Sequence, residues 1–242
     1  NQPKAARVLY VPENGHCFVQ ADYKSAELYV MAWMAGDQRL LADLAGDMHQ
    51  KNADRLGVTR KVAKNVTYAS QYLASPSKQS EMILKQEHIY VSPFECFRIA
   101  EGIWGHYDRV KTYKEHLVNL CRLKKHIKNP FGRIRFFHAN EAPAAVDFIP
   151  QSTVADVLWC VLKPVADMAK RYGGRLYTTV HDSILIAVPL EHREAAAMEM
   201  KAIMERRFDI VAVGFYIPVE IEWAGPGEPW SKVKEAAVEA YS

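Results

Sequence analysis

Apolar residues near the start of the chain follow a pattern that predicts extended structure. Residues 7–11 and 16–21 form two strand-like runs, and the Pro-Glu-Asn-Gly sequence between them is typical of a turn. We therefore expect a β-hairpin over this stretch. From residue 25 to residue 34 the pattern becomes helical, and the helix should end near Gly36.

Residues 38–128 have the pattern of helices joined by short loops. Pro76 and Pro93 mark breaks between helices, whereas the helical stretch 59–74 contains neither proline nor glycine. The remaining expected elements are a turn at 129–132, a helix at 151–171, strands at 175–180 and 184–188, an amphipathic helix at 191–207 and a strand at 217–223. This order predicts an α+β fold in which an all-helical insertion interrupts one sheet in the sequence.

Composition narrows the class of protein only slightly. The chain is 49% hydrophobic and 24% charged, as in an ordinary globular protein, and its net charge of +3 does not by itself indicate nucleic-acid binding. Its four cysteines form no CxxC pair, which disfavours zinc sites and disulfides and favours a reducing, cytoplasmic location. We see no signal peptide and no apolar run long enough to cross a membrane, so no membrane partner is expected.

Two aspartates occupy unusual places in the pattern. Asp22 follows the apolar run 17–21, and Asp182 interrupts the β-rich stretch 177–186, although aspartate is disfavoured within strands. A turn or a helix cap is the ordinary explanation for either residue alone. Phosphoryl transfer requires positioned phosphates and neutralised charge, which two Mg²⁺ ions held by one or two carboxylates can supply. Two aspartates brought together from different strands would meet that requirement.

Four separated segments resemble, in the same order, the motifs of the family A DNA polymerases. They are ADYKSAEL at 21–28, RKVAKNVTYASQY at 60–72, PQSTVAD at 150–156 and VHDS at 180–183. The GRIR turn at 132–135 and PVEIE at 218–222, followed by Trp230, add to the resemblance. It covers nearly the whole chain and implies a polymerase palm, an antiparallel sheet with helices, formed by 1–35 and 140–242, with helical fingers at 36–139.

The resemblance implies that Asp22 and Asp182 hold two Mg²⁺ ions. It also implies that Lys64 neutralises the phosphates and protonates the leaving group, which would make Lys64 a catalytic residue. Arg60, Lys64, Tyr68 and Tyr72 recur every four residues, so they should lie along one helix stripe facing the nucleotide. The alternative is a solvated amphipathic face with partly buried tyrosines.

Further contacts follow from the same resemblance. His49 corresponds to a phosphate-binding histidine, and Glu27 to a glutamate that crowds a ribose 2′-hydroxyl and so favours deoxynucleotides. Contacts with the DNA are implied for Gln151, His181, Arg133 and Arg135. Each of these residues, taken alone, has an ordinary explanation as a surface, cap or strand-end side chain.

The implied activity is template-directed DNA synthesis from dNTPs, with pyrophosphate release. The expected partners are primer–template DNA, dNTPs, and a thumb and possibly an exonuclease segment N-terminal to Asn1, where the chain starts abruptly. A thumb is not visible in this sequence, which we interpret as the C-terminal part of a longer protein. The cytoplasm of a bacterial or phage-infected cell fits this resemblance, with an organelle as the alternative.

The chain also departs from the family pattern. Ser183 stands where most members carry glutamate, as in single-subunit phage RNA polymerases, and Ala69 and Leu73 replace glycines of the second motif. These departures leave two rivals: an RNA polymerase of that kind, and a non-catalytic nucleic-acid-binding relic. Glu27 argues against the first, and the retained aspartates and phosphate-facing cations argue against the second.

Overall fold

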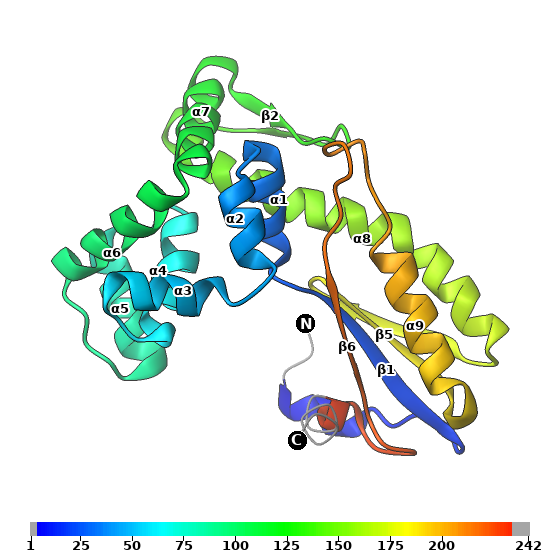
Figure 1. Ribbon diagram of the computed structural model, residues 1–242. Helices are drawn as coiled ribbons and strands as arrows, with labels where there is room; N and C mark the ends of the chain where they lie inside the picture. Colours follow the sequence, from blue (N-terminus) through cyan, green and yellow to red (C-terminus); the bar gives the residue numbers. More distant parts are fainter. Residues whose placement is uncertain (1–3, 234–242) are drawn as a thin grey trace. The chain divides into compact units, whose positions relative to one another are not determined.

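The computed structural model describes residues 4–233, which form two compact units (Figure 1). We call residues 4–26, 154–209 and 213–233 the sheet unit. Glu27–Thr153 with Ile210–Ala212 form the helical unit. The division between compact units thus falls after Ala26 and after Thr153, whereas the sequence places the palm–fingers boundaries after residues 35 and 139.

The sheet unit contains one antiparallel sheet with the strand order β4-β5-β1-β6. Its strands are β1 (His16–Tyr23), β4 (Arg175–Val180), β5 (Ser183–Pro189) and β6 (Val219–Trp223). All four were expected from their apolar runs. β1 is the central strand: it pairs with β5 from His16↔Pro189 to Asp22↔Ser183, and with β6 along its other edge.

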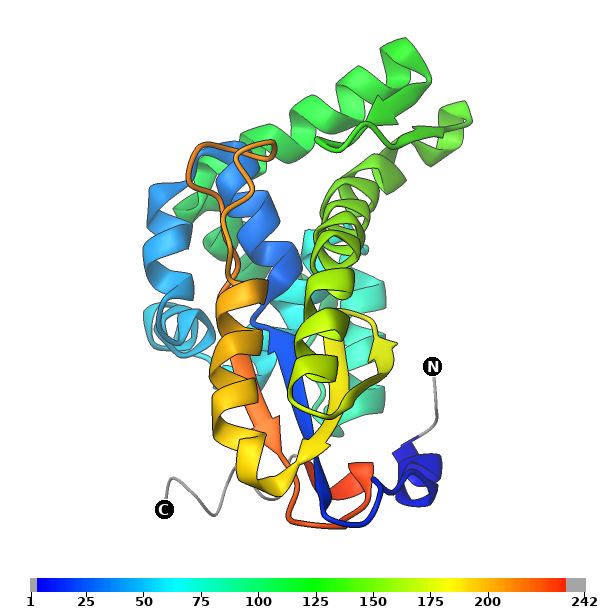
Figure 2. The same ribbon diagram turned by 90° about the vertical axis from the view of Figure 1, so that its right-hand side faces the viewer.

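The two faces of this sheet bury different partners. Figure 2 shows α9 (Arg193–Met204) and the second half of α8 (Ala145–Arg171) on one face, where the Tyr23 hydroxyl donates to the Met204 carbonyl at 3.0 Å. Successive strand residues point to opposite faces, so Phe18, Gln20 and Asp22 lie on the other face. There Phe18 packs in a core cluster with Trp230, whose indole N–H donates to Gln20 Oε1 at 2.8 Å.

The expected strand at 7–11 is wrong. Lys4–Leu9 is instead a 3₁₀ helix, η1, that packs against the 3₁₀ helix η4 (Trp230–Lys232). The Arg7 guanidinium lies 4.4 Å from the centre of the Trp230 ring, and the Tyr10 ring meets that indole edge-on at 5.8 Å. These contacts join the two ends of the described chain, so a local pattern could not predict them.

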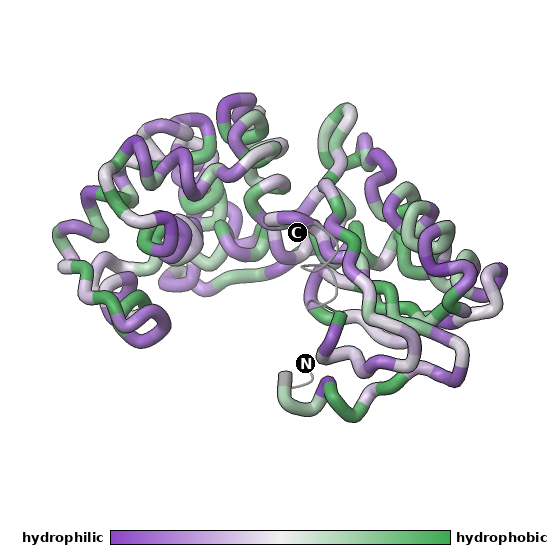
Figure 3. Tube along the Cα trace, turned by 60° about the horizontal axis from the view of Figure 1, so that its bottom comes forward, coloured by the Kyte–Doolittle hydropathy of each residue, from purple (hydrophilic) through white to green (hydrophobic). Residues whose placement is uncertain are grey.

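The helical unit follows the expected run of helices. They are α1 (Ala26–Ala35, its first residue in the sheet unit), α2 (Gln38–Leu44), α3 (Met48–Leu56), α4 (Arg60–Gln71), α5 (Pro76–Glu87), α6 (Pro93–His106) and α7 (Asp108–Lys124). Polar side chains at Asp37, Asp47, Thr59, Ser75 and Ser92 accept a backbone N–H at the starts of α2 to α6. Hydrophilic and hydrophobic residues are interspersed along the helices of this unit (Figure 3), and α3 to α7 each bury apolar residues, such as Ala53, Val66, Ile83, Ile103 and Leu117.

A small hairpin and a long helix complete the helical unit. Strands β2 (His126–Lys128) and β3 (Ile134–Phe136) flank the expected turn, in which the Gly132 N–H donates to the Asn129 carbonyl at 3.0 Å. The 3₁₀ helix η2 (Ala139–Ala144) follows, and α8 then begins at Ala145, not at residue 151. The helix runs through Pro150.

The expectation that no apolar run is long enough to cross a membrane is wrong by length and composition, because the helical segment Asn140–Arg171 meets both criteria. Its most apolar window has a mean hydropathy of 1.3, and 56% of that window is buried inside the protein. Val157, Val161 and Val165 are fully buried along α8. These contacts are those of a core helix, so its hydropathy follows from packing.

Candidate active site

A row of polar residues crosses three strands at one end of the sheet. Asp22 on β1 is paired with Ser183 on β5 and with Glu220 on β6. Residues directly opposite in antiparallel strands have Cβ atoms about 5 Å apart on the same face. The Asp182 carbonyl, one residue before Ser183, accepts the Tyr23 N–H at 3.3 Å. The structure therefore brings Asp22 and Asp182 to the same end of adjoining strands.

His181 and Asp182 form the two-residue turn between β4 and β5. Val180 pairs with Ser183 across this turn, and the Ser183 hydroxyl donates to the Val180 carbonyl at 2.9 Å. His181 has a φ of 55°, a left-handed conformation that histidine adopts more readily than most residues other than glycine. The turn exposes the His181 side chain and leaves Asp182 partly exposed, so both can meet a ligand.

The acidic residues at this end suit a hard divalent cation. Within residues 4–233, no group of three or more His, Cys, Asp or Glu residues is placed to hold a metal ion by itself. Asp22 and Asp182 supply carboxylate oxygens, which Mg²⁺ prefers, and Mg²⁺ commonly takes only one or two such ligands plus substrate phosphates. The Lys24 ammonium lies 3.9 Å from the Glu220 carboxylate and limits the negative charge of the row. The residues present therefore fit magnesium bound together with a phosphate-bearing substrate.

In the helical unit, α4 carries the predicted cationic stripe. The helix begins at Arg60, after Thr59, whose hydroxyl oxygen accepts the Val62 N–H at 3.3 Å. Arg60 Nε donates to Asp47 Oδ2 at 2.7 Å, and this hydrogen bond is the main reason that the Asp47 pKa lies below its usual value. Arg60 is thus already engaged with a carboxylate, whereas Lys64 is exposed and has no ion pair in the described part of the chain.

His49 lies beside this stripe. It is 7% exposed, and the centre of its ring lies 5.5 Å from that of Tyr68. Burial, followed by the nearby charges of Lys64 and Arg60, lowers the His49 pKa to about 4, so the imidazole is neutral at neutral pH. Its Nδ1 atom is buried and has no hydrogen-bond partner within residues 4–233. The structure therefore gathers His49, Arg60, Lys64 and Tyr68 into one cluster, which we call the cationic cluster.

The other predicted contact residues lie outside this cluster. Tyr72 caps the C-terminus of α4, and Glu27 lies in the first turn of α1; both are partly buried. Gln151 is exposed, and it lies within α8, not at the N-terminus of a helix.

Arg133 and Arg135 are exposed on the β2–β3 hairpin, and the Arg135 guanidinium stacks on the Phe137 ring at 4.8 Å. Asn129 ties this hairpin to α8, because its side-chain amide donates to the Ser152 hydroxyl at 3.0 Å, next to Gln151. The arginines and Gln151 are therefore carried by two connected elements.

Two buried charged residues of the helical unit escaped the sequence analysis. Lys114 on α7 is 5% exposed, and Asp147 on α8 is partly buried with a buried Oδ1 that has no hydrogen-bond partner in the described chain. A signal for Lys114 does exist in the sequence. It occupies the apolar stripe of α7 with Val110, Leu117 and Cys121, where a charged residue is out of place.

Replacing Asp147 by asparagine is expected to stabilise the fold at pH 8 but not at pH 4. Burial raises the Asp147 pKa to about 6, although Arg135 and Lys114 oppose this effect. The folded state then holds this proton more tightly than the unfolded state, so the free energy of unfolding falls as pH rises from about 4 to about 6. Removing the charge should recover about 1 kcal/mol above pH 6, after allowance for partial exposure.

Urea unfolding at both pH values measures this gain. Asp167→Asn is the control, because Asp167 lies exposed on the same helix and is paired with Lys163. An equal gain at both pH values, or a loss at pH 8, would contradict the assignment of a buried charge to Asp147.

Comparison with known proteins identifies the architecture. The sequence profile of DNA polymerase family A matches residues 1–232. The chain belongs to this family.

The chain is also similar in sequence to known DNA polymerases. The chain is 26% identical over 251 residues to the thermostable DNA polymerase I of Thermus aquaticus, covering 95% of this chain and 29% of that protein. It is 25% identical over 210 residues to the DNA polymerase of Mycobacterium phage L5, covering 86% of this chain and 34% of that protein. The chain thus spans about a third or less of the length of these polymerases.

The fold matches that of a solved polymerase domain. This is the POL domain of Pol1 from M. smegmatis, in complex with DNA primer-template and dNTP, with a TM-score of 0.79 and 21% identity. The match covers 96% of this chain and 43% of the other. At this identity it shows that this chain has the polymerase α+β fold.

Proposed function

We propose that this chain is the palm and fingers of a DNA-directed DNA polymerase, which extends a primer 3′-hydroxyl with dNTPs. The observation that carries the proposal is the strand register, which places Asp22 and Asp182 at one end of adjoining strands in a member of family A. A non-catalytic relic has no need of two such carboxylates in this place. The location that we propose for this chain is the cytoplasm, as expected from the sequence.

In the proposed reaction, the primer 3′-hydroxyl loses its proton to solvent and its oxygen bonds to the α-phosphorus of the dNTP, while the bond from that phosphorus to the bridging oxygen of pyrophosphate breaks. Asp22 and Asp182 would hold two magnesium ions, which would supply charge neutralisation and lower the pKa of the 3′-hydroxyl. The fingers bind the triphosphate through Arg60, Lys64 and His49. Lys64 is the group that returns a proton to the leaving pyrophosphate.

The remaining residues position the sugar, the base and the DNA. Tyr68 and Tyr72 lie at the C-terminal part of α4 and provide rings for the nucleotide sugar and base. The exposed groups proposed to contact primer–template DNA are Gln151, His181, Arg133 and Arg135. A glutamine at the minor groove can reach acceptors shared by all base pairs, which tests their shape without reading sequence. We also propose that a thumb segment N-terminal to Asn1 completes the grip on the duplex.

Glu27→Ala tests the choice of DNA over RNA synthesis. The complete polypeptide that carries this chain should prefer dNTPs over rNTPs in primer extension. Removing the Glu27 carboxylate should raise rNTP incorporation about tenfold or more, because it opens room for the 2′-hydroxyl, and should change dNTP incorporation less. Glu81→Ala is the control, since Glu81 is an exposed helix residue paired with Lys78. A wild-type protein that prefers rNTPs would identify an RNA polymerase instead.

A further inference from the structure

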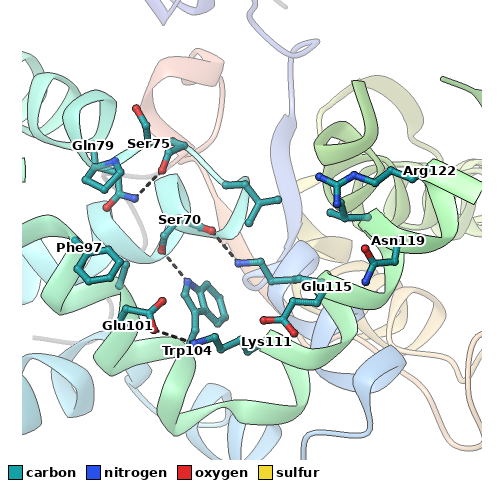
Figure 4. Close-up of a pocket in the computed structure, with 16 residues that line it drawn as sticks. Ser70, Ser75, Gln79, Phe97, Glu101, Trp104, Lys111, Glu115, Asn119 and Arg122 are labelled. Carbon is teal, nitrogen blue, oxygen red and sulfur yellow. Dashed lines mark hydrogen bonds and ion pairs between the residues drawn. The ribbon is translucent and has the colours of Figure 1, made fainter. Parts of the chain in front are cut away.

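The helical unit contains a cavity of about 550 Å³ beside the C-terminal end of α4 (Figure 4). Its walls come from the last turn of α4, the start of α5, and the facing sides of α6 and α7. Lys114 of α7 lines this cavity yet is 5% exposed, and lysine is almost never buried so deeply without a partner. The groups that contact the Lys114 ammonium should therefore indicate why the lysine is buried.

Lys114 is engaged by a backbone carbonyl and by an aromatic face. Its ammonium donates to the Ser70 carbonyl at 2.8 Å and lies 4.1 Å from the centre of the Trp104 ring. Ser70 is also held through its side chain, because the Trp104 indole N–H donates to Ser70 Oγ at 2.8 Å. Helices α6 and α7 thus hold the same residue of α4, one by its hydroxyl and the other by its main chain.

The segment that they hold is strained. Leu73 follows the end of α4 with a φ of 56°, a conformation that costs little for glycine but is unfavourable for leucine. The Leu73 N–H donates to the same Ser70 carbonyl at 3.2 Å, and the Ala74 N–H donates to the Ala69 carbonyl at 3.1 Å. Ser70 therefore joins the strained turn to Lys114.

We infer that Lys114 is a positioning residue for the incoming nucleotide. By holding the Ser70 carbonyl, it fixes the C-terminal turn of α4 and so the orientation of Tyr68 and Tyr72 on that helix. It touches neither the cationic cluster nor the aspartate row in the described contacts. The inference rests on the proposed function, because α4 is assigned there to nucleotide binding.

The environment of Lys114 brings the pKa of its ammonium close to neutral pH. Burial lowers the Lys114 pKa to about 7, opposed by Asp147 from α8 and Glu101 from α6, while Lys111 on α7 lowers it further. The last turn of α4 contains no charged side chain, and its Ser70 carbonyl accepts the hydrogen bond from Lys114. Lys114 thus loses its charge near neutral pH, which weakens its hold on both the carbonyl and the Trp104 ring.

The test compares Lys114→Met with Lys111→Met. Both remove one positive charge from the same helix and cavity, but Lys111 is paired with Glu101 and makes no described contact with α4. In the complete polypeptide, Lys114→Met should lower kcat/KM for dNTP about tenfold, with the Kd for primer–template changed less than about twofold. Lys111→Met should match wild type. Adding Leu73→Gly to Lys114→Met should restore most of the loss, because the turn no longer needs holding.

Two further measurements separate this inference from the proposed function. Hydrogen exchange of the Leu73 and Ala74 amides, followed in this chain without substrate, should be about tenfold faster in Lys114→Met while α9 amides stay unchanged. In wild type, kcat/KM for dNTP should fall as pH rises through 7, and this fall should be absent in Lys114→Met. If Lys114→Met fails to fold, Lys114→Gln, which keeps an N–H donor, takes its place with a smaller expected change.

Unchanged exchange together with unchanged kcat/KM would overturn the positioning role. If wild type extends no primer, the proposed function fails, while the exchange result still decides whether Lys114 holds α4. Faster exchange in Lys111→Met as well would also overturn the inference, since the effect would then belong to charge removal in general.

Discussion

Asp182→Asn should abolish template-directed DNA synthesis by the complete protein, lowering kcat about a thousandfold or more. The Asp182 carboxylate is proposed to hold metal ions that neutralise charge developing on the phosphates, and an amide oxygen holds Mg²⁺ far more weakly. Asp182 lies in a partly exposed two-residue turn, so the substitution should leave the sheet intact. Single-turnover primer extension at saturating dNTP measures the effect, and a gel shift without metal shows that DNA is still bound.

Two further variants make this result specific. Asp22→Asn should cost about as much as Asp182→Asn, and the double variant little more, because both residues are proposed to hold the same ions and such effects are not additive. Glu220→Gln is the matched control: Glu220 pairs with Asp22 in the register but is more exposed and lies 3.9 Å from Lys24. Synthesis by Asp182→Asn within tenfold of wild type, or an equal loss in Glu220→Gln, would contradict the metal-binding assignment.

Local patterns predicted those parts of the fold whose contacts are close in sequence or regular in spacing. β1 and β5 are apolar runs and are mostly buried in the middle of the sheet, whereas the edge strands β4 and β6 are largely partly exposed. The stretch 7–11 has the same kind of pattern, but Arg7 and Tyr10 pack on Trp230, and Lys4–Leu9 forms a 3₁₀ helix. The start of α8 was placed six residues too late, at residue 151, whereas the helix begins at Ala145 and runs through Pro150.

In the candidate site, too, the sequence predicted residues that local patterns mark and missed contacts between distant residues. Asp22 and Asp182 stood out because each follows or interrupts an apolar run, and the register then placed them at the same end of adjoining strands. The roles on α4 depended on the family resemblance, since a four-residue spacing equally describes a solvated helix face. The hold of Lys114 on Ser70 could not be predicted, because its partner is a backbone carbonyl 44 residues away on another helix. Nothing in the side-chain sequence identifies which carbonyl a buried lysine meets.

Lys64→Met should lower kcat about a hundredfold, a larger loss than Arg60→Met should cause. The two cations of α4 differ in their present partners. Arg60 already donates to Asp47 at 2.7 Å, so a triphosphate must share or displace a carboxylate there. Lys64 has no ion pair within residues 4–233, so its charge is available to phosphate and its proton to the leaving pyrophosphate. We therefore expect Arg60→Met to act mainly through KM for dNTP.

Lys61→Met is the matched control, because Lys61 lies exposed on the same helix but is paired with Glu87 at 3.1 Å. It should leave synthesis within about twofold of wild type. An NMR titration provides a readout that does not depend on activity. Lys64 lies close enough to His49 to lower its pKa, so Lys64→Met should raise the His49 pKa above about 4, and Lys61→Met should not. A shifted His49 pKa would confirm that Lys64 lies in the cationic cluster. If kcat were unchanged in the same variant, Lys64 would be only a neighbouring charge and would have no part in the chemical step.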